Sequence, residues 1–192
     1  MSKENKRKQQ AKLLRTFRKV HRTTGALLFV FFFVMSVTGL LLGWKKNSSG
    51  IILAETRTGV SQDFKNWLPM DLLHQNAVQV YKDSISAEGP VTVDRIDIRK
   101  NKGMLKFTFE GNFWGIQMDG ATGKPLYIEK RRGDYIEKLH DGSILDHYLG
   151  VKNGWIKLFY TTVMGTALFI FTATGFWLWY GPKRMRKGHA NS

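Results

Sequence analysis

The pattern of apolar and polar positions divides the chain into two long uncharged runs and a mixed segment between them. Residues 25–44 contain no charged side chain, and neither do residues 158–180. A helix needs roughly 18–20 apolar residues to cross about 30 Å of hydrocarbon, so this pattern predicts two transmembrane helices. The first run is too long for a signal peptide, and residues 43–46 offer no small-residue cleavage site. We expect it to remain attached as an anchor.

Between the two runs the spacing of apolar residues changes from helical to strand-like. Residues 69–83 begin with a proline that suits a first helical turn and show a partial apolar face that includes Leu72 and Leu73, which predicts a helix. Alternating apolar residues then predict four strands, over residues 91–99, 104–110, 113–119 and 125–130. The alternation slips in phase after Val93. Short Gly and Asn turns between the strands are typical of an antiparallel meander.

A weaker helical pattern, over residues 134–149, precedes the second apolar run. Its apolar positions suit one face of an interfacial helix, although Gly142 weakens the pattern. His140 and His147 are seven residues apart and would share a face of one continuous helix.

These elements predict an α+β membrane protein, in which two transmembrane helices flank a small domain of one helix and an antiparallel meander. The predicted segments are a basic N-terminal segment (1–22), a first transmembrane helix (23–46), a small domain (47–133), an interfacial segment (134–154), a second transmembrane helix (155–181) and a basic tail (182–192).

The net charge of +15 is concentrated at the two ends of the chain. Basic residues dominate before the first apolar run and after the second, whereas bases and acids nearly balance between them. This is the positive-inside pattern, which predicts cytoplasmic termini and an extracytoplasmic small domain. We expect the basic ends to meet anionic lipid headgroups. Nucleic acid is the less favoured partner, because neither end interleaves aromatic residues with its charges.

The residue types limit the chemistry that this chain can support. It has no cysteine, which excludes disulfides, thiolate metal sites and iron–sulfur ligation. The small domain shows no nucleophile–base pair and no glycine-rich phosphate loop followed by a helix, and the chain has no flavin or nicotinamide fingerprint. We therefore interpret the small domain as a binding or positioning module, and His74 within it as a surface or packing residue.

One histidine, His21, stands at the start of the first apolar run. An imidazole beside lipid is costly without a partner, so a functional role is one interpretation. From the residue alone we favour the simpler interpretation, in which His21 faces headgroups with the neighbouring basic residues.

The two apolar runs also resemble each other, since FVMSVTGLLLGW (33–44) aligns with FIFTATGFWLWY (169–180). Because the helices would run in opposite directions, Thr38-Gly39 and Thr174-Gly175 should lie near opposite membrane faces. Such small residues permit close helix packing, or space for a flat cofactor.

Three stretches together resemble the PepSY-associated transmembrane family. They are KVHRTTG before the first apolar run, the turn DGATGKPL, and KLHDGSILDHYLG before the second run. The chain is similar to a short member with two spans, whereas larger members have four or more. The resemblance implies a PepSY-like domain. It further implies b-type haem in the membrane and a role in iron uptake, which in some members includes reduction of ferric siderophores.

The resemblance implies that histidines at the two membrane faces are axial ligands of haem b. His21 would serve the cytoplasmic side, and His140 the outer side with His147 as the alternative. A span of 20 residues is about 30 Å long, so one iron cannot bind histidines at both faces. A homodimer that forms a four-helix bundle would supply paired ligands at each face.

Other residues near His21 would then contact the same group. Gly25 lies on the face of His21 and would leave room for the porphyrin. The nearby cations would pair with haem propionates; they are Arg18, Lys19 and Arg22.

On this basis we expect a membrane haem protein that transfers electrons across a bacterial inner membrane to ferric iron or a ferric siderophore. Its activity would be that of a haem-dependent ferric reductase, with another protein, a quinol or a small reductant as electron donor. The alternative is a non-enzymatic, membrane-anchored PepSY binding module, similar to the inhibitory or chaperoning segments of secreted proteases. A third hypothesis is a subunit of a larger transporter.

Overall fold

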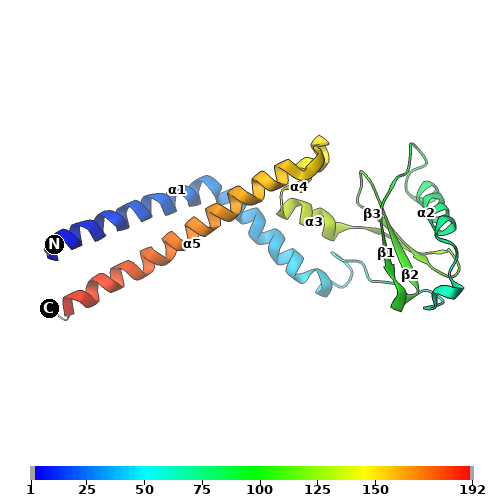
Figure 1. Ribbon diagram of the computed structural model, residues 1–192, viewed down its shortest axis with the longest axis horizontal. Coiled ribbons are helices and arrows are strands. Elements are labelled where there is room, and N and C mark those ends of the chain that lie inside the picture. Colours follow the sequence, from blue (N-terminus) through cyan, green and yellow to red (C-terminus); the bar gives the residue numbers. More distant parts are fainter. Residues whose placement is uncertain (1–2, 191–192) are drawn as a thin grey trace. The chain divides into compact units, whose positions relative to one another are not determined.

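The computed structural model describes residues 3–190, with side chains for residue 5 and residues 8–184. Two compact units make up the chain. One unit combines Met1–Thr38 with His140–Ser192, and the other is Gly39–Leu139. The first contains one long helix and most of the other, whose last residues, 39–44, belong to the second unit together with the sheet (Figure 1).

The two long helices confirm the prediction of two elements long and apolar enough to cross a membrane. They are α1 (Lys3–Trp44) and α5 (Trp155–Ala190). Within the candidate spans, Lys8–Asn47 and Lys152–Arg184, the apolar 18-residue windows have mean hydropathies of 2.5 and 1.5, and only 6% and 11% of each window is buried. The core helix of a soluble protein would be mostly buried, so these exposed apolar faces fit a lipid environment. The basic N-terminal segment continues the helix of the first span without a break from Lys3.

Within their unit, α1 and α5 lie side by side and run antiparallel (Figure 1). Phe17 meets Trp177 with ring centroids 6.2 Å apart, and further along α1 Phe31 meets Tyr160 at 6.2 Å. Near the middle of α5, Met164 is buried. Both ends of the chain therefore lie at the same end of the helix pair.

The second unit contains the predicted antiparallel meander. Its strands are β1 (Val93–Arg99), β2 (Met104–Phe109), β3 (Trp114–Asp119) and β4 (Pro125–Lys130), in the order β1-β2-β3-β4. All neighbouring strands pair antiparallel. The phase slip seen in the sequence is a register irregularity between Val93 and Arg95, where β1 pairs with β2.

One face of this sheet forms the hydrophobic core with α2 (Met70–Ser84). The helix buries Leu73, Ala77 and Tyr81, which recur every four residues along one face, against Phe107 and other residues of the sheet. Leu72, which the sequence places on the apolar face, is 39% exposed because it is one position away from this stripe.

The opposite face of the sheet contains a buried polar network. The Lys106 ammonium pairs with the Glu129 carboxylate, and Gln117 Nε2 donates to Glu129 Oε2 at 2.8 Å. The Gln117 side chain also donates to the Glu55 carbonyl and accepts from the Arg57 amide. Both its nitrogen and its oxygen therefore have hydrogen-bond partners. A buried charge needs such partners, because desolvation without them is costly.

The DGATGKPL stretch forms a tight turn between β3 and β4. The buried Asp119 carboxylate accepts from the amides of Ala121 and Val60 at 2.8 and 3.0 Å. Gly120 lies under the Trp67 indole, where an added Cβ would be 2.4 Å from the ring. Gly123 has a φ of +66°, in the region that favours glycine. The motif is therefore required by the geometry of this turn.

The segment before α5 differs from the single helix expected over residues 134–149. It forms two helices, α3 (Arg132–His140) and α4 (Ser143–Leu149). Gly142 between them has a φ of +77°, which ends the helical path. Consequently His140 and His147 lie in different helices and share no helix face. Four short 3₁₀ turns complete the described chain: η1 (Lys45–Asn47), η2 (Phe64–Asn66), η3 (Lys100–Lys102) and η4 (Lys152–Gly154).

Candidate functional site

The first candidate site, the His21 site, lies where α1 packs against α5. The half-buried imidazole of His21 stacks on the Phe171 ring with centroids 3.9 Å apart. Its Nδ1 atom is 3.1 Å from both the Phe171 carbonyl oxygen and Thr174 Oγ1. Gly175 provides the space for the ring, because a Cβ there would be 3.2 Å from His21 Cε1. The histidine at the start of one span is thus held by the Thr-Gly pair of the other.

The second candidate site, the His140 site, repeats this relation at the other end of the helix pair. The half-buried His140, at the end of α3, places Nδ1 2.9 Å from Thr38 Oγ1 of α1. Thr38 and Thr174 are each only 6% exposed. Thr38 follows His21 by 17 residues in one helix, which separates the two sites by about 25 Å along α1.

The His140 site is fixed by contacts between the α3–α4 segment and the start of α5. Asp146 in α4 accepts from the backbone amides of Ile156 and Lys157 at 3.1 and 2.8 Å. These are first-turn amides of α5 that lack partners within the helix, so a carboxylate stabilises them as a cap. Gly142 is buried against the Tyr160 ring, where an added Cβ would lie 2.7 Å from the ring. The KLHDGSILDHYLG stretch therefore anchors His140 to the second span.

Asp141, next to His140, is part of the same anchor. Its carboxylate lies 2.6 Å from Lys157 Nζ and accepts from the Ser143 amide at 2.9 Å. Partial burial raises the pKa of Asp141, but the hydrogen bonds from Lys157 and Ser143 outweigh it and place the pKa below its ordinary value of 3.8. The ionised carboxylate is therefore the form that holds this segment.

The other residues predicted around the histidines have different surroundings. Gly25 faces the Phe171 ring, where an added Cβ would lie 2.9 Å from Cε2, so that ring occupies the space expected for a porphyrin. Arg18 and Arg22 are exposed on α1. His147 lies beside Tyr148, with ring centroids 5.3 Å apart. The roles predicted for these residues remain predictions.

The chemistry of both sites is that of single imidazoles rather than of a protein metal cage. Among residues 3–190, the described side chains form no group of three or more His, Asp or Glu that could hold a metal ion. In the same part of the chain, no buried side-chain nitrogen or oxygen lacks a hydrogen-bond partner. The hydrogen bonds of His21 and His140 all involve Nδ1. Their Nε2 atoms are therefore not fully buried, and each nitrogen is left to provide one ligand to a metal centre.

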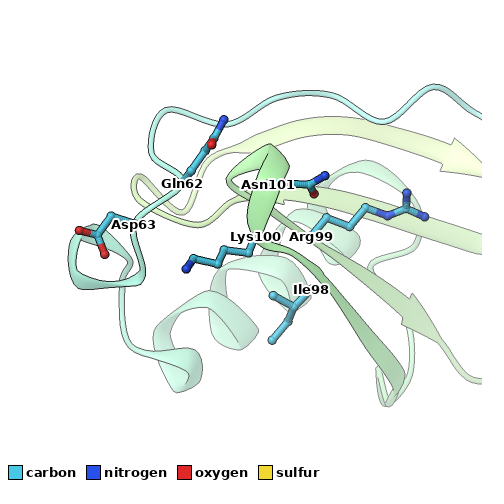
Figure 2. Close-up of a pocket in the computed structure, with 6 residues that line it drawn as sticks. All are labelled: Gln62, Asp63, Ile98, Arg99, Lys100 and Asn101. Atoms are coloured by element: carbon cyan, nitrogen blue, oxygen red, sulfur yellow. The ribbon is translucent and has the colours of Figure 1, made fainter.

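The small domain has a separate feature, a shallow cleft of about 830 Å³ (Figure 2). The lining residues combine two cations, one carboxylate, two amides and one apolar side chain; they are Arg99, Lys100, Asp63, Gln62, Asn101 and Ile98. Ile98 is 50% exposed, and the Lys100 ammonium lies over the Phe64 ring at 5.2 Å. This lining suits contact with an anionic or amphipathic ligand.

Sequence reasoning identifies the two histidines and the two threonines but does not pair them. The sequence does indicate which residues share a membrane face. His21 and Thr174-Gly175 are predicted near one face, and His140 and Thr38-Gly39 near the other. Phe171 and Asp146 are the residues that it missed. Phe171 stacks on a residue of another helix, and Asp146 caps α5 from ten residues before Ile156. Neither contact produces a local sequence pattern.

The fold and the sites define this chain as an α+β membrane protein in which two long helices join a small four-stranded domain. The family model of the PepSY-associated TM region matches residues 4–191. The chain therefore belongs to this family, which confirms the resemblance seen in the three sequence stretches. No curated protein matches the chain, and no solved structure does.

Proposed function

We propose that this membrane protein binds haem b through His21 and His140 and transfers electrons across the bacterial inner membrane to a ferric chelate. The observation that carries the proposal is the repeated arrangement of the two histidines. Each has Nδ1 within hydrogen-bond distance of a buried threonine of a long helix, and neither Nε2 is fully buried. Histidine is a usual axial ligand of haem iron, and its second ring nitrogen is typically hydrogen-bonded in metal sites.

Two separate positions each offer one imidazole ligand to such a group, and at the His21 site the Phe171 ring fills the space beside Gly25, so the porphyrin would not lie there. Bound haem would supply an iron that accepts and releases one electron. Because the histidines lie at opposite ends of the helix pair, about 25 Å apart along α1, they would serve two sites rather than one. Two sites of this kind lie on a path from one membrane face to the other.

Each site offers one histidine from this chain, so the proposal includes a homodimer. A two-fold axis along the helix pair would bring a second His21 and a second His140 to complete paired ligands. The four long helices of the dimer would form a bundle, and bundle cores are common positions for cofactors. The exposed apolar residues of both helices, among them Phe29 and Phe169, are available for that contact or for lipid.

The charge pattern orients the proposal in the membrane. The excess of basic residues at both ends supports an orientation with the termini and His21 on the cytoplasmic side and the small domain outside. A donor on the cytoplasmic side or a quinol would reduce the His21 site. The small domain would bind the ferric acceptor.

Histidine variants test the ligand assignment in the full-length protein. His21→Ala and His140→Ala should each remove one haem per dimer, whereas His147→Ala should leave the haem content unchanged. Oxidation of the reduced protein by a ferric chelate should be fast in the wild type and slow in both ligand variants. Unchanged haem content in His21→Ala, or loss of haem in His147→Ala, would refute the assignment.

A second candidate function is a non-enzymatic, membrane-anchored binding module. The cleft on the small domain favours it, because Arg99, Lys100 and the exposed Ile98 offer a surface for a ligand without any redox group. Visible absorption by haem distinguishes the two candidate functions. A binding module needs no haem, and it would bind its ligand with both histidines replaced.

A further inference from the structure

The threonine hydroxyls beside the two histidines have hydrogen-bond acceptors within their own helices. Thr38 Oγ1 donates to the Val34 carbonyl at 2.7 Å, and Thr174 Oγ1 donates to the Ile170 carbonyl at 2.7 Å. A hydroxyl has one proton and two lone pairs. A second backbone carbonyl of the same helix lies 3.3 Å from Thr38 Oγ1 and 3.1 Å from Thr174 Oγ1, so the single proton of each hydroxyl has two acceptors in its own helix. A hydroxyl that donates to its own helix acts toward the histidine as an acceptor.

This direction determines which ring nitrogen of each histidine carries the proton. When the hydroxyls donate to their own helices, the contacts of 2.9 Å to His140 Nδ1 and 3.1 Å to His21 Nδ1 are donated by an N–H on Nδ1. At His21 the Phe171 carbonyl oxygen, also 3.1 Å from Nδ1, gives independent support because a carbonyl cannot donate. In a neutral imidazole only one nitrogen bears hydrogen, so Nε2 keeps its lone pair.

We infer that Thr38 and Thr174 are positioning residues that hold His140 and His21 in the Nδ1–H tautomer and present Nε2 as an electron-pair donor. The tautomer follows from the hydrogen bonds alone. Its use for binding iron rests on the proposed function. An acceptor on Nδ1–H also raises the basicity of Nε2, as in other histidine metal sites.

Burial strengthens the effect of the two hydroxyls. Both threonines are 6% exposed, so water has little access to replace them. A half-buried imidazole beside lipid has few other hydrogen-bond partners. Loss of the threonine hydroxyl would therefore be unfavourable for Nδ1–H.

The first test measures the tautomer directly and needs no haem. Histidine-labelled, full-length protein in detergent micelles is examined by ¹⁵N NMR at a pH above the ordinary histidine pKa of about 6.5. Glutamine substitutions of single histidines assign the signals. We expect a protonated Nδ1 and an unprotonated Nε2 at His21 and His140. A protonated Nε2 at either residue would overturn the inference for that site.

The second test separates positioning from a purely structural role. Thr174→Val removes the acceptor at nearly constant volume, and Thr174→Ser retains it; the same pair is made at Thr38. Thr162→Val is the matched control, since Thr162 Oγ1 makes the same 2.7 Å bond within α5 but is exposed. Haem affinity and midpoint potential are measured by titration with haem and by redox titration of the loaded protein.

The valine variants should bind haem about tenfold more weakly at the affected site, the scale typical of such supporting residues. Their midpoint potential should rise, because a less basic imidazole stabilises ferric iron less. Serine should restore both values, and Thr162→Val should change neither. Wild-type values in both valine variants would overturn the positioning role. If the protein binds no haem at all, the proposed function fails, while the NMR result still decides the tautomer.

Discussion

Replacing Gly175 with alanine tests whether close helix contact determines the position of the His21 ring. The new Cβ would lie 3.2 Å from Cε1 and 3.7 Å from Nδ1 of His21. Carbon atoms in contact prefer about 3.5–4.0 Å, so the ring must move by a few tenths of an ångström. It cannot move freely, because the Phe171 ring stacks on it at a centroid distance of 3.9 Å.

The cost of this movement follows from the hydrogen bonds of Nδ1. The distances to the Phe171 carbonyl and to Thr174 Oγ1 are both 3.1 Å, close to the upper limit of about 3.2 Å for N–H···O bonds. Losing one such bond costs about 1 kcal/mol. That corresponds to about fivefold weaker binding of a ligand that needs this ring orientation.

Alanine also favours a helix over glycine by about 1 kcal/mol, which must be separated from the effect on His21. Gly165→Ala is the matched control, because it lies in the same helix and its added Cβ meets nothing within 4 Å. Haem titration of both variants in detergent, with the His21 signals followed by NMR, provides the comparison. We expect about fivefold weaker binding at the His21 site of Gly175→Ala alone. Identical affinities and unchanged His21 signals in the two variants would refute the reasoning.

Three further predictions concern the turn, the buried network and the anchor. Asp119→Ala leaves buried amides without an acceptor and should lower the free energy of unfolding by about 3 kcal/mol. The control Asp97→Ala breaks an exposed ion pair and should lower it by less than about 1 kcal/mol. Urea unfolding in micelles, followed by tryptophan fluorescence, measures both changes. Glu129→Ala leaves the Lys106 ammonium unpaired and should cost about 3–5 kcal/mol by the same assay, and the addition of Lys106→Met should recover much of that loss. Because the folded pKa of Asp141 is lowered, its stabilisation is present above about pH 3.8 and is lost as the pH falls through the folded pKa; thermal unfolding of the wild type and Asp141→Asn should therefore differ at neutral pH and converge in acid.

The fold was predictable wherever local pattern and final environment agree. The strands over residues 91–130 alternate because one sheet face meets α2, and the slip after Val93 is the observed irregularity of β1. The break at Gly142 was not predictable with certainty, because a glycine in a helical pattern is tolerated in some helices and ends others. In the structure Gly142 has a left-handed conformation and lies against Tyr160 of α5, a contact that the local sequence does not reveal.

The sequence predicts the histidines and threonines of the two sites, but it does not predict which histidine contacts which threonine. Polarity beside lipid singles out His21, and the internal repeat singles out Thr38 and Thr174. The hydrogen bonds between them depend on how the two helices are rotated about their axes, and the apolar pattern does not determine this rotation because lipid accepts apolar residues on every side. The Phe171 ring, one aromatic among many in these helices, becomes distinctive only through its stacking on His21.

The most direct test of the central claim is the visible spectrum of the purified, full-length protein in mild detergent. A reduced-minus-oxidised difference spectrum is recorded with the ratio of haem to chain. The account predicts sharp bands of low-spin haem b at about one haem per chain, as two sites in a homodimer require. A colourless protein that also fails to take up added haem would contradict the assignment of His21 and His140 as iron ligands.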